Sequence, residues 1–101
     1  MYRLLALYPA PADPAHFKAH YASVHLPLAS RLPGLRAMHH SFAIEGPAGT
    51  AAPYFCVWSG SFDDAATLQH AMASPEGQAL AADVPLYASG GVVMMSYPDG
   101  E

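Results

Sequence analysis

Apolar residues occur along the chain in short runs, and turn-forming residues separate the runs. Tyr2–Tyr8 is an apolar run that ends at Pro9, which predicts a strand and its end. Residues 54–61 read YFCVWSGS, and their aromatic and β-branched side chains predict the clearest strand. The side chains of residues 35–45 would point to alternate faces of an extended segment, which indicates a strand. Residues 92–97 form another apolar run after a glycine pair and indicate the last strand. Together these runs predict four strands.

Helical spacing begins directly after the first predicted strand. Asp13 and Pro14 have the form of an N-cap and a proline at the first helical position. Apolar residues then recur every three or four positions and form one stripe, made of Phe17, Tyr21, Val24, Leu28 and Leu32. Pro27 lies inside this pattern and has no backbone N–H, so we expect a kink or break near Leu26.

A second helical region follows the third predicted strand. Asp63 and Asp64 open a helix to about residue 73, and Ser74-Pro75 caps a short helix to about residue 83. The resulting order is β-α-β-β-α-β with an extra short helix before the last strand. This order predicts a single α+β domain over residues 1–101 with a ferredoxin-like fold, in which helices cover one face of a four-stranded antiparallel sheet.

The composition suggests that the uncovered sheet face is also buried. Apolar residues make up 52% of the chain and charged residues 12%, which is about half the usual charged share. The strands are apolar on both faces, since Met38, Phe42 and Ile44 lie opposite Leu35 and its alternating neighbours. We therefore expect a homodimer in which two sheets pair face to face and form a barrel.

Charge and cysteine usage exclude several classes of function. The net charge is −4, and the four basic residues are scattered, which argues against binding to nucleic acid. The single cysteine, Cys56, forms no internal disulfide, so a reducing compartment is expected. The pattern shows neither a secretory signal nor an apolar run near the roughly 20 residues that span a bilayer, so we expect a cytoplasmic protein without membrane contact.

His25 is the main candidate for chemistry, with Asp83 as its partner. His25 lies at the margin of the helical stripe beside Pro27, where an imidazole can reach a cleft and act as a general acid or base. Asp83 ends the second helical region, and its carboxylate would orient the ring of His25. The alternatives are a structural histidine that braces the break and an aspartate that binds turn backbone before Pro85. The marginal position predicts that replacing His25 costs little packing.

Aromatic residues provide a candidate ligand pocket with hydroxyl and indole donors. The candidate ligand-binding residues are Tyr21, His39, Tyr54, Trp58 and Tyr87. Tyr54 and Trp58 fall on the same strand face as Cys56. The alternative is that these side chains belong to an ordinary core or to the subunit interface.

The other histidines do not indicate a metal site. His16 and His20 have the i, i+4 spacing of helical metal ligands, but no third ligand is evident. His39 and His40 are adjacent on a strand and point to opposite faces. Cys56 has no evident activating base. The sequence therefore predicts no metal and no bound cofactor, and nothing in it selects a haem.

Three stretches of the chain resemble the EthD family. Residues 7–35 contain Tyr-Pro, then Phe17, His25-Leu-Pro-Leu and a Leu-Pro-Gly, and residues 62–84 contain a Ser-Pro-Glu-Gly turn and the following Asp83. The third stretch is the glycine pair with the closing strand. The resemblance implies a dimeric α+β barrel and supports His25 and Asp83 as site residues, whereas His16, His20 and His40 fall outside the family pattern.

The resemblance also implies a setting for the chemistry. EthD-like proteins are associated with degradation operons and with polyketide-type metabolism, so the expected function is a small-molecule enzyme or accessory protein of aromatic, polyketide-like or ether degradation metabolism. A cofactor-free isomerisation, dehydration or oxygenation would take place between the first helix and the sheet, with His25 as acid or base. The alternatives are a non-catalytic binding protein for a small apolar ligand and a purely structural dimer domain.

Overall fold

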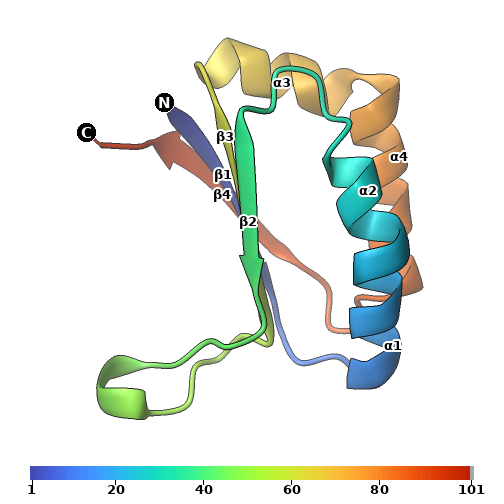
Figure 1. Ribbon diagram of the computed structural model, residues 1–101, viewed down its shortest axis with the longest axis vertical. Helices are drawn as coiled ribbons and strands as arrows, with labels where there is room; N and C mark the ends of the chain where they lie inside the picture. The colour runs from blue at the N-terminus through green and yellow to red at the C-terminus, as the bar shows by residue number, and fades with distance from the viewer. Residues whose placement is uncertain (101) are drawn as a thin grey trace.

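A computed structural model describes residues 1–100 of the chain. Its sheet is antiparallel, with the strand order β2-β3-β1-β4 (Figure 1). The strands are β1 (Tyr2–Tyr8), β2 (Ala37–Ser41), β3 (Cys56–Phe62) and β4 (Val93–Pro98). The α-helices all lie on one side of this sheet and leave the other side uncovered. The predicted ferredoxin-like α+β arrangement is confirmed.

The first helical region is interrupted where the sequence predicts a disturbance. It consists of α1 (Pro14–His20), the π-helical turn η1 (Tyr21–His25) and α2 (Leu26–Ala29). Asp13 caps α1 by accepting a 3.0 Å hydrogen bond from the backbone N–H of His16. The N–H of Leu26 donates to the carbonyl of Tyr21, five residues back, just before Pro27. The expected kink is therefore a single π turn.

The π turn changes which side chains face the core. Its extra residue widens the turn, so residues spaced by four stay on one face. Phe17, Tyr21, His25 and Ala29 are all buried, at 0%, 0%, 4% and 1% exposure. Val24, which a regular helix would bury, is 37% exposed. The predicted stripe was thus wrong at Val24, whereas Leu28 packs against the core and Leu32 is 4% exposed as expected. His25 takes the place of Val24 on the buried face and does not lie at its margin.

The second helical region agrees with its predicted start and stop signals. It comprises α3 (Ala65–Ala73), α4 (Pro75–Asp83) and the 3-10 turn η3 (Val84–Leu86). The side chain of Asp64 accepts from the N–H of Thr67 at 2.8 Å, and that of Ser74 accepts from the N–H of Gly77 at 3.1 Å. These two caps satisfy N–H groups that have no partner within the helices.

Three strands differ slightly from their predicted bounds. β2 is shorter than residues 35–45, because after Ser41 the chain turns away and the Ser41 hydroxyl accepts from the N–H of Ala43. β3 begins at Cys56, so Tyr54 lies outside it, and β4 is shifted by one residue. A loop with the short 3-10 turn η2 (Pro47–Gly49) joins β2 to β3.

The two faces of the sheet are unequally covered. Leu4, Ala6 and Tyr8 of β1 face the helices and are 2–6% exposed. The residues that alternate with them point away from the helices. We call this uncovered surface the open sheet face; its apolar residues are Leu5, Leu7, Val57, Val93, Met95 and Tyr97. Among residues 1–100, no helix combines the length and apolar character needed to cross a bilayer.

Candidate functional site

An apolar cavity lies between the sheet and the helices. Its volume is about 430 Å³ with the open mouth included. Apolar wall residues from the sheet and the helices include Leu4, Ala6, Met94, Ala29, Leu80 and Val84. The residues with polar side-chain groups at the wall are His25, Tyr8 and Trp58. The cavity is bounded by η1, α2 and α4 as well as by the strands, and of the five candidate ligand-binding residues Trp58 alone belongs to its wall.

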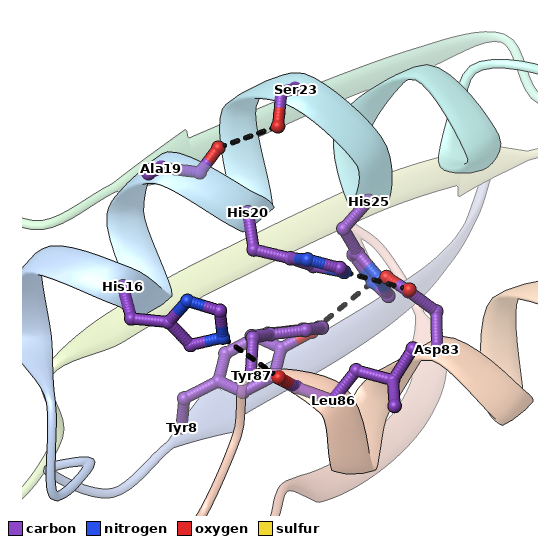
Figure 2. Close-up of polar contacts among 9 residues, drawn as sticks. All are labelled: Tyr8, His16, Ala19, His20, Ser23, His25, Asp83, Leu86 and Tyr87. Carbon is purple, nitrogen blue, oxygen red and sulfur yellow. Dashed lines mark hydrogen bonds and ion pairs between the residues drawn. The ribbon is translucent and has the colours of Figure 1, made fainter.

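His25 and Asp83 meet at this wall although 58 positions separate them in sequence. Nδ1 of His25 lies 2.9 Å from Oδ2 of Asp83 (Figure 2), and the residues are 4% and 6% exposed. A carboxylate only accepts hydrogen bonds, so Nδ1 is the donor. In the neutral ring Nε2 then carries no hydrogen and is an acceptor.

Burial controls the charge of this imidazole. Desolvation lowers the pKa of His25 below its ordinary value, against the opposing attraction of Asp83. His25 is therefore a neutral base near pH 7. Its buried position also corrects the expected cost of replacing it, because removal would leave Oδ2 of Asp83 without its partner inside the protein.

Asp83 binds a second imidazole that the sequence did not indicate. Oδ1 of Asp83 lies 2.8 Å from Nε2 of His20, whose side chain is 18% exposed. Figure 2 shows both rings directed at the same carboxyl group. His20 and His25 are five residues apart, a spacing that faces different sides of a regular α-helix. The available signal was Pro27, because the π turn before it brings both residues to one side.

Two tyrosines complete the surroundings of His25. The hydroxyl of Tyr8 lies 2.8 Å from that of Tyr87 and 3.5 Å from Nε2 of His25. Burial raises the pKa of Tyr8 and of Tyr87, so both stay protonated. Tyr87 was a candidate residue, and its ring lies 4.8 Å from that of His25. Tyr8 was missed as a site residue, and its signals were its place at the end of β1 and its membership of the Tyr-Pro pair in the EthD-like stretch.

Two further candidate aromatics also lie at the site. Tyr21 is fully buried and stacks on His25, with ring centroids 5.2 Å apart and planes 18° from parallel. Trp58 lines the cavity. Within residues 1–100, neither the hydroxyl of Tyr21 nor the indole N–H of Trp58 has a hydrogen-bond partner.

The remaining two candidates lie away from His25. His39 is exposed and pairs in register with Ser59, which places it on the open sheet face. Tyr54 precedes β3 and is half-buried, and it does not contribute to the cavity wall among the residues that the structure describes. The structure therefore brings together Tyr21, Trp58 and Tyr87 but not His39 or Tyr54.

The helical histidine pair is engaged in other contacts. Nε2 of His16 lies 2.9 Å from the carbonyl of Leu86, and Nε2 of His20 is bound to Asp83. Residues 1–100 contain no group of three or more His, Cys, Asp or Glu side chains placed to hold a metal ion. Burial raises the pKa of Cys56 to about 11, so this thiol is a poor nucleophile.

Comparison with known proteins agrees with this fold. A protein of Rhodococcus erythropolis, described as an uncharacterised 11.0 kDa protein in the thcB-thcC intergenic region, is 40% identical over 97 residues, covering 94% of this chain and 91% of that protein. The crystal structure of an ethyl tert-butyl ether D (EthD) family protein of Bacillus halodurans C-125 matches with a TM-score of 0.88 and 32% identity, over 98% of both chains.

A more distant structure shows the fold alone. A dimeric ferredoxin-like protein of unknown function from Jannaschia sp. CCS1 matches with a TM-score of 0.67 and 19% identity, over 96% of each chain. The sequence model of the EthD domain matches residues 10–91, a range that includes α1, η1, α4 and thus both His25 and Asp83. The chain belongs to the EthD domain family.

Proposed function

We propose that the protein binds a small apolar or aromatic molecule in the cavity and that His25 acts on it as a general acid or base. The observation that carries the proposal is the buried contact between Nδ1 of His25 and Asp83 at the wall of an apolar cavity. Asp83 holds the tautomer in which Nε2 is an acceptor, and burial keeps the ring neutral.

The proposed step is a proton transfer at Nε2. His25 takes a proton from a bound molecule, and Asp83 stabilises the resulting imidazolium through the Nδ1–H bond. The same proton then returns to another atom of the molecule, which completes an isomerisation or prepares an elimination. The hydroxyl of Tyr8, 3.5 Å from Nε2, is near enough to contact the reacting group. These side chains suffice for the step without a cofactor.

The metabolic setting and the assembly belong to the same proposal. The Bacillus halodurans relative is named for ethyl tert-butyl ether, which supports the ether part of the proposed role in ether, aromatic or polyketide-like degradation metabolism. The free thiol of Cys56 supports a cytoplasmic location. A homodimer that pairs two open sheet faces is supported by their apolar residues and by the dimeric protein from Jannaschia sp..

Exchange of acidic carbon-bound protons tests the catalytic role without the natural substrate. A panel of enolisable ketones and 1,3-dicarbonyl compounds is incubated with the protein in deuterium oxide, and exchange is followed by proton NMR. We expect accelerated exchange for at least one compound and a fall of about 10²–10⁴-fold in the His25→Gln variant. The exposed His39, on the open sheet face, supplies the control, because His39→Gln leaves the cavity unchanged.

The non-catalytic alternative predicts a different outcome of this experiment. A binding protein would take up members of the panel without exchanging their protons, and binding would survive His25→Gln. A structural dimer domain would show neither binding nor exchange. Either result contradicts a general acid or base at His25.

A further inference from the structure

The cavity wall constrains the charge and hydrogen bonding of whatever binds there. Resting on the proposed function and deepening it, we infer that the ligand is an uncharged weak acid, a phenol or enol with an apolar body, which donates its O–H to Nε2 of His25. Carboxylates, phosphates and other anions are excluded as ligands of this cavity.

The absence of a counter-charge excludes anions. Within the described part of the chain, no Lys, Arg, Asp or Glu side chain lines the cavity. Two of the four cationic side chains are engaged elsewhere, since Arg3 binds Asp99 and Arg36 binds Asp63. The carboxylate of Asp83, which binds Nδ1 of the wall residue His25, repels negative charge. An anion would lose its hydration without gaining a partner, which is a large cost in an apolar cavity.

The hydrogen-bond pattern selects a donor on the ligand. Nε2 of His25 is an acceptor because Nδ1–H is committed to Asp83. The hydroxyl of Tyr8 lies 3.5 Å from Nε2, at the outer limit of hydrogen bonding, and 2.8 Å from the hydroxyl of Tyr87, where either oxygen can be the donor. A ligand O–H at a normal hydrogen-bond distance would replace this long contact at Nε2.

The charges that form when the ligand gives up its proton limit the class of ligand further. When the ligand O–H gives its proton to Nε2, the electron pair of that bond stays on the ligand oxygen, and His25 becomes the imidazolium partner of Asp83. The imidazolium is the only full positive charge that the described wall residues provide beside the new anion. An anion stabilised by its own delocalisation, as in a phenolate or enolate, fits such a site best.

Three single-ring probes of similar shape test this assignment in the full chain: phenol, toluene and benzoate. Calorimetric titration should give measurable binding of phenol and toluene and at least tenfold weaker binding of benzoate. In protein with ¹⁵N-labelled histidine, phenol should shift the Nε2 resonance of His25 as a hydrogen bond forms, and toluene should not. In His25→Phe, phenol should lose about fivefold in affinity relative to toluene, the effect of one net hydrogen bond.

The outcomes separate this inference from the proposed catalysis. Benzoate binding as tight as phenol, or an Nε2 resonance unmoved by bound phenol, overturns the ligand class, and the labelled wild-type protein decides this even if His25→Phe fails to fold. If phenol does not bind but carbonyl compounds exchange their protons in a reaction that depends on His25, the proposed ligand class is also overturned and the proposed catalysis stands. If phenol binds selectively but no carbonyl compound exchanges its protons, the proposed ligand class is supported and the proposed catalysis is contradicted.

Discussion

Asp83 is the residue on which the polar part of the site depends. Its two oxygens accept from Nδ1 of His25 at 2.9 Å and from Nε2 of His20 at 2.8 Å, and the residue is 6% exposed. A buried carboxylate is tolerated only when its oxygens are satisfied, so the two imidazoles and Asp83 form one unit. His20, the more exposed ring, holds Asp83 in the position that fixes the tautomer of His25.

Two substitutions of His20 separate this role from simple packing. His20→Phe keeps a flat ring against Tyr87, which stacks on His20 at 5.5 Å and 21°, but removes the N–H donor. His20→Gln loses the ring and keeps an N–H for Asp83. We expect His20→Phe to cost about 1–2 kcal/mol of unfolding free energy and to disturb the His25 tautomer in ¹⁵N NMR spectra. His20→Gln should preserve the tautomer, and the reverse ranking would show that His20 serves only in packing.

The lowered pKa of His25 predicts how stability depends on pH. At a pH below the ordinary histidine pKa of about 6.5, His25 binds a proton in the unfolded chain, whereas the buried ring of the folded protein stays neutral to lower pH. This contribution to stability is fully present above about pH 6.5 and is lost as pH falls through the folded pKa. Urea unfolding at about pH 7.5, 6.5 and 5.5 measures it. His25→Gln should have a slope smaller by up to about 1.4 kcal/mol per pH unit, and equal slopes would contradict the neutral ring.

At the scale of elements, local signals identified where helices start and stop. Asp13, Asp64 and Ser74 are all N-caps in the structure, as predicted, because a cap depends on residues within one turn. Pro27 indicated a disturbance but not its form. A kink, a break and a π turn can each accommodate the missing N–H of proline, and tertiary packing decides among them. The burial of His25 could therefore not be predicted from a helical period of 3.6 residues.

The corner between α3 and α4 sets the position of Asp83. A side chain at Gly77 would place its Cβ atom against backbone, 2.6 Å from the carbonyl oxygen of Met72. We therefore expect Gly77→Ala to shift α4 and to lower the unfolding free energy by about 1–3 kcal/mol. Glu76→Ala, at the neighbouring exposed position, is the matched control and should cost less. Chemical denaturation measures both, and equal stability of the two variants would contradict the close packing at this corner.

At the scale of the molecule, the site is assembled from segments that the topology brings together. Tyr8 ends β1, His20 and His25 lie in the first helical region, and Asp83 ends α4. The family pattern supported His25 and Asp83 as site residues, their pairing was a hypothesis from general triad logic, and the structure places the two side chains 2.9 Å apart. Tyr8 belongs to the Tyr-Pro pair of that pattern but was not singled out, and His20 falls outside the pattern. The contacts of both residues depend on how the helices lie over the sheet. The same topology places His39 on the open sheet face, away from the cavity.

The open sheet face predicts the assembly of the whole molecule. Val93, Met95 and Tyr97 are 40%, 44% and 37% exposed on β4, and they continue the apolar surface of Leu5. A surface of this kind is stabilised when a second copy covers it. Light scattering at micromolar concentration should therefore give about twice the chain mass of 10.7 kDa.

A charge on that face should disrupt the pair of sheets. Met95→Asp buries an unpaired carboxylate in the proposed interface, so we expect a monomer or a chain with markedly lower unfolding free energy that depends on protein concentration. Ala66→Asp is the control, because Ala66 is exposed in the first turn of α3, where a carboxylate favours the helix dipole. That variant should remain dimeric. A monomeric wild type, or a dimer unchanged by Met95→Asp, would show that the open sheet face is not the subunit interface.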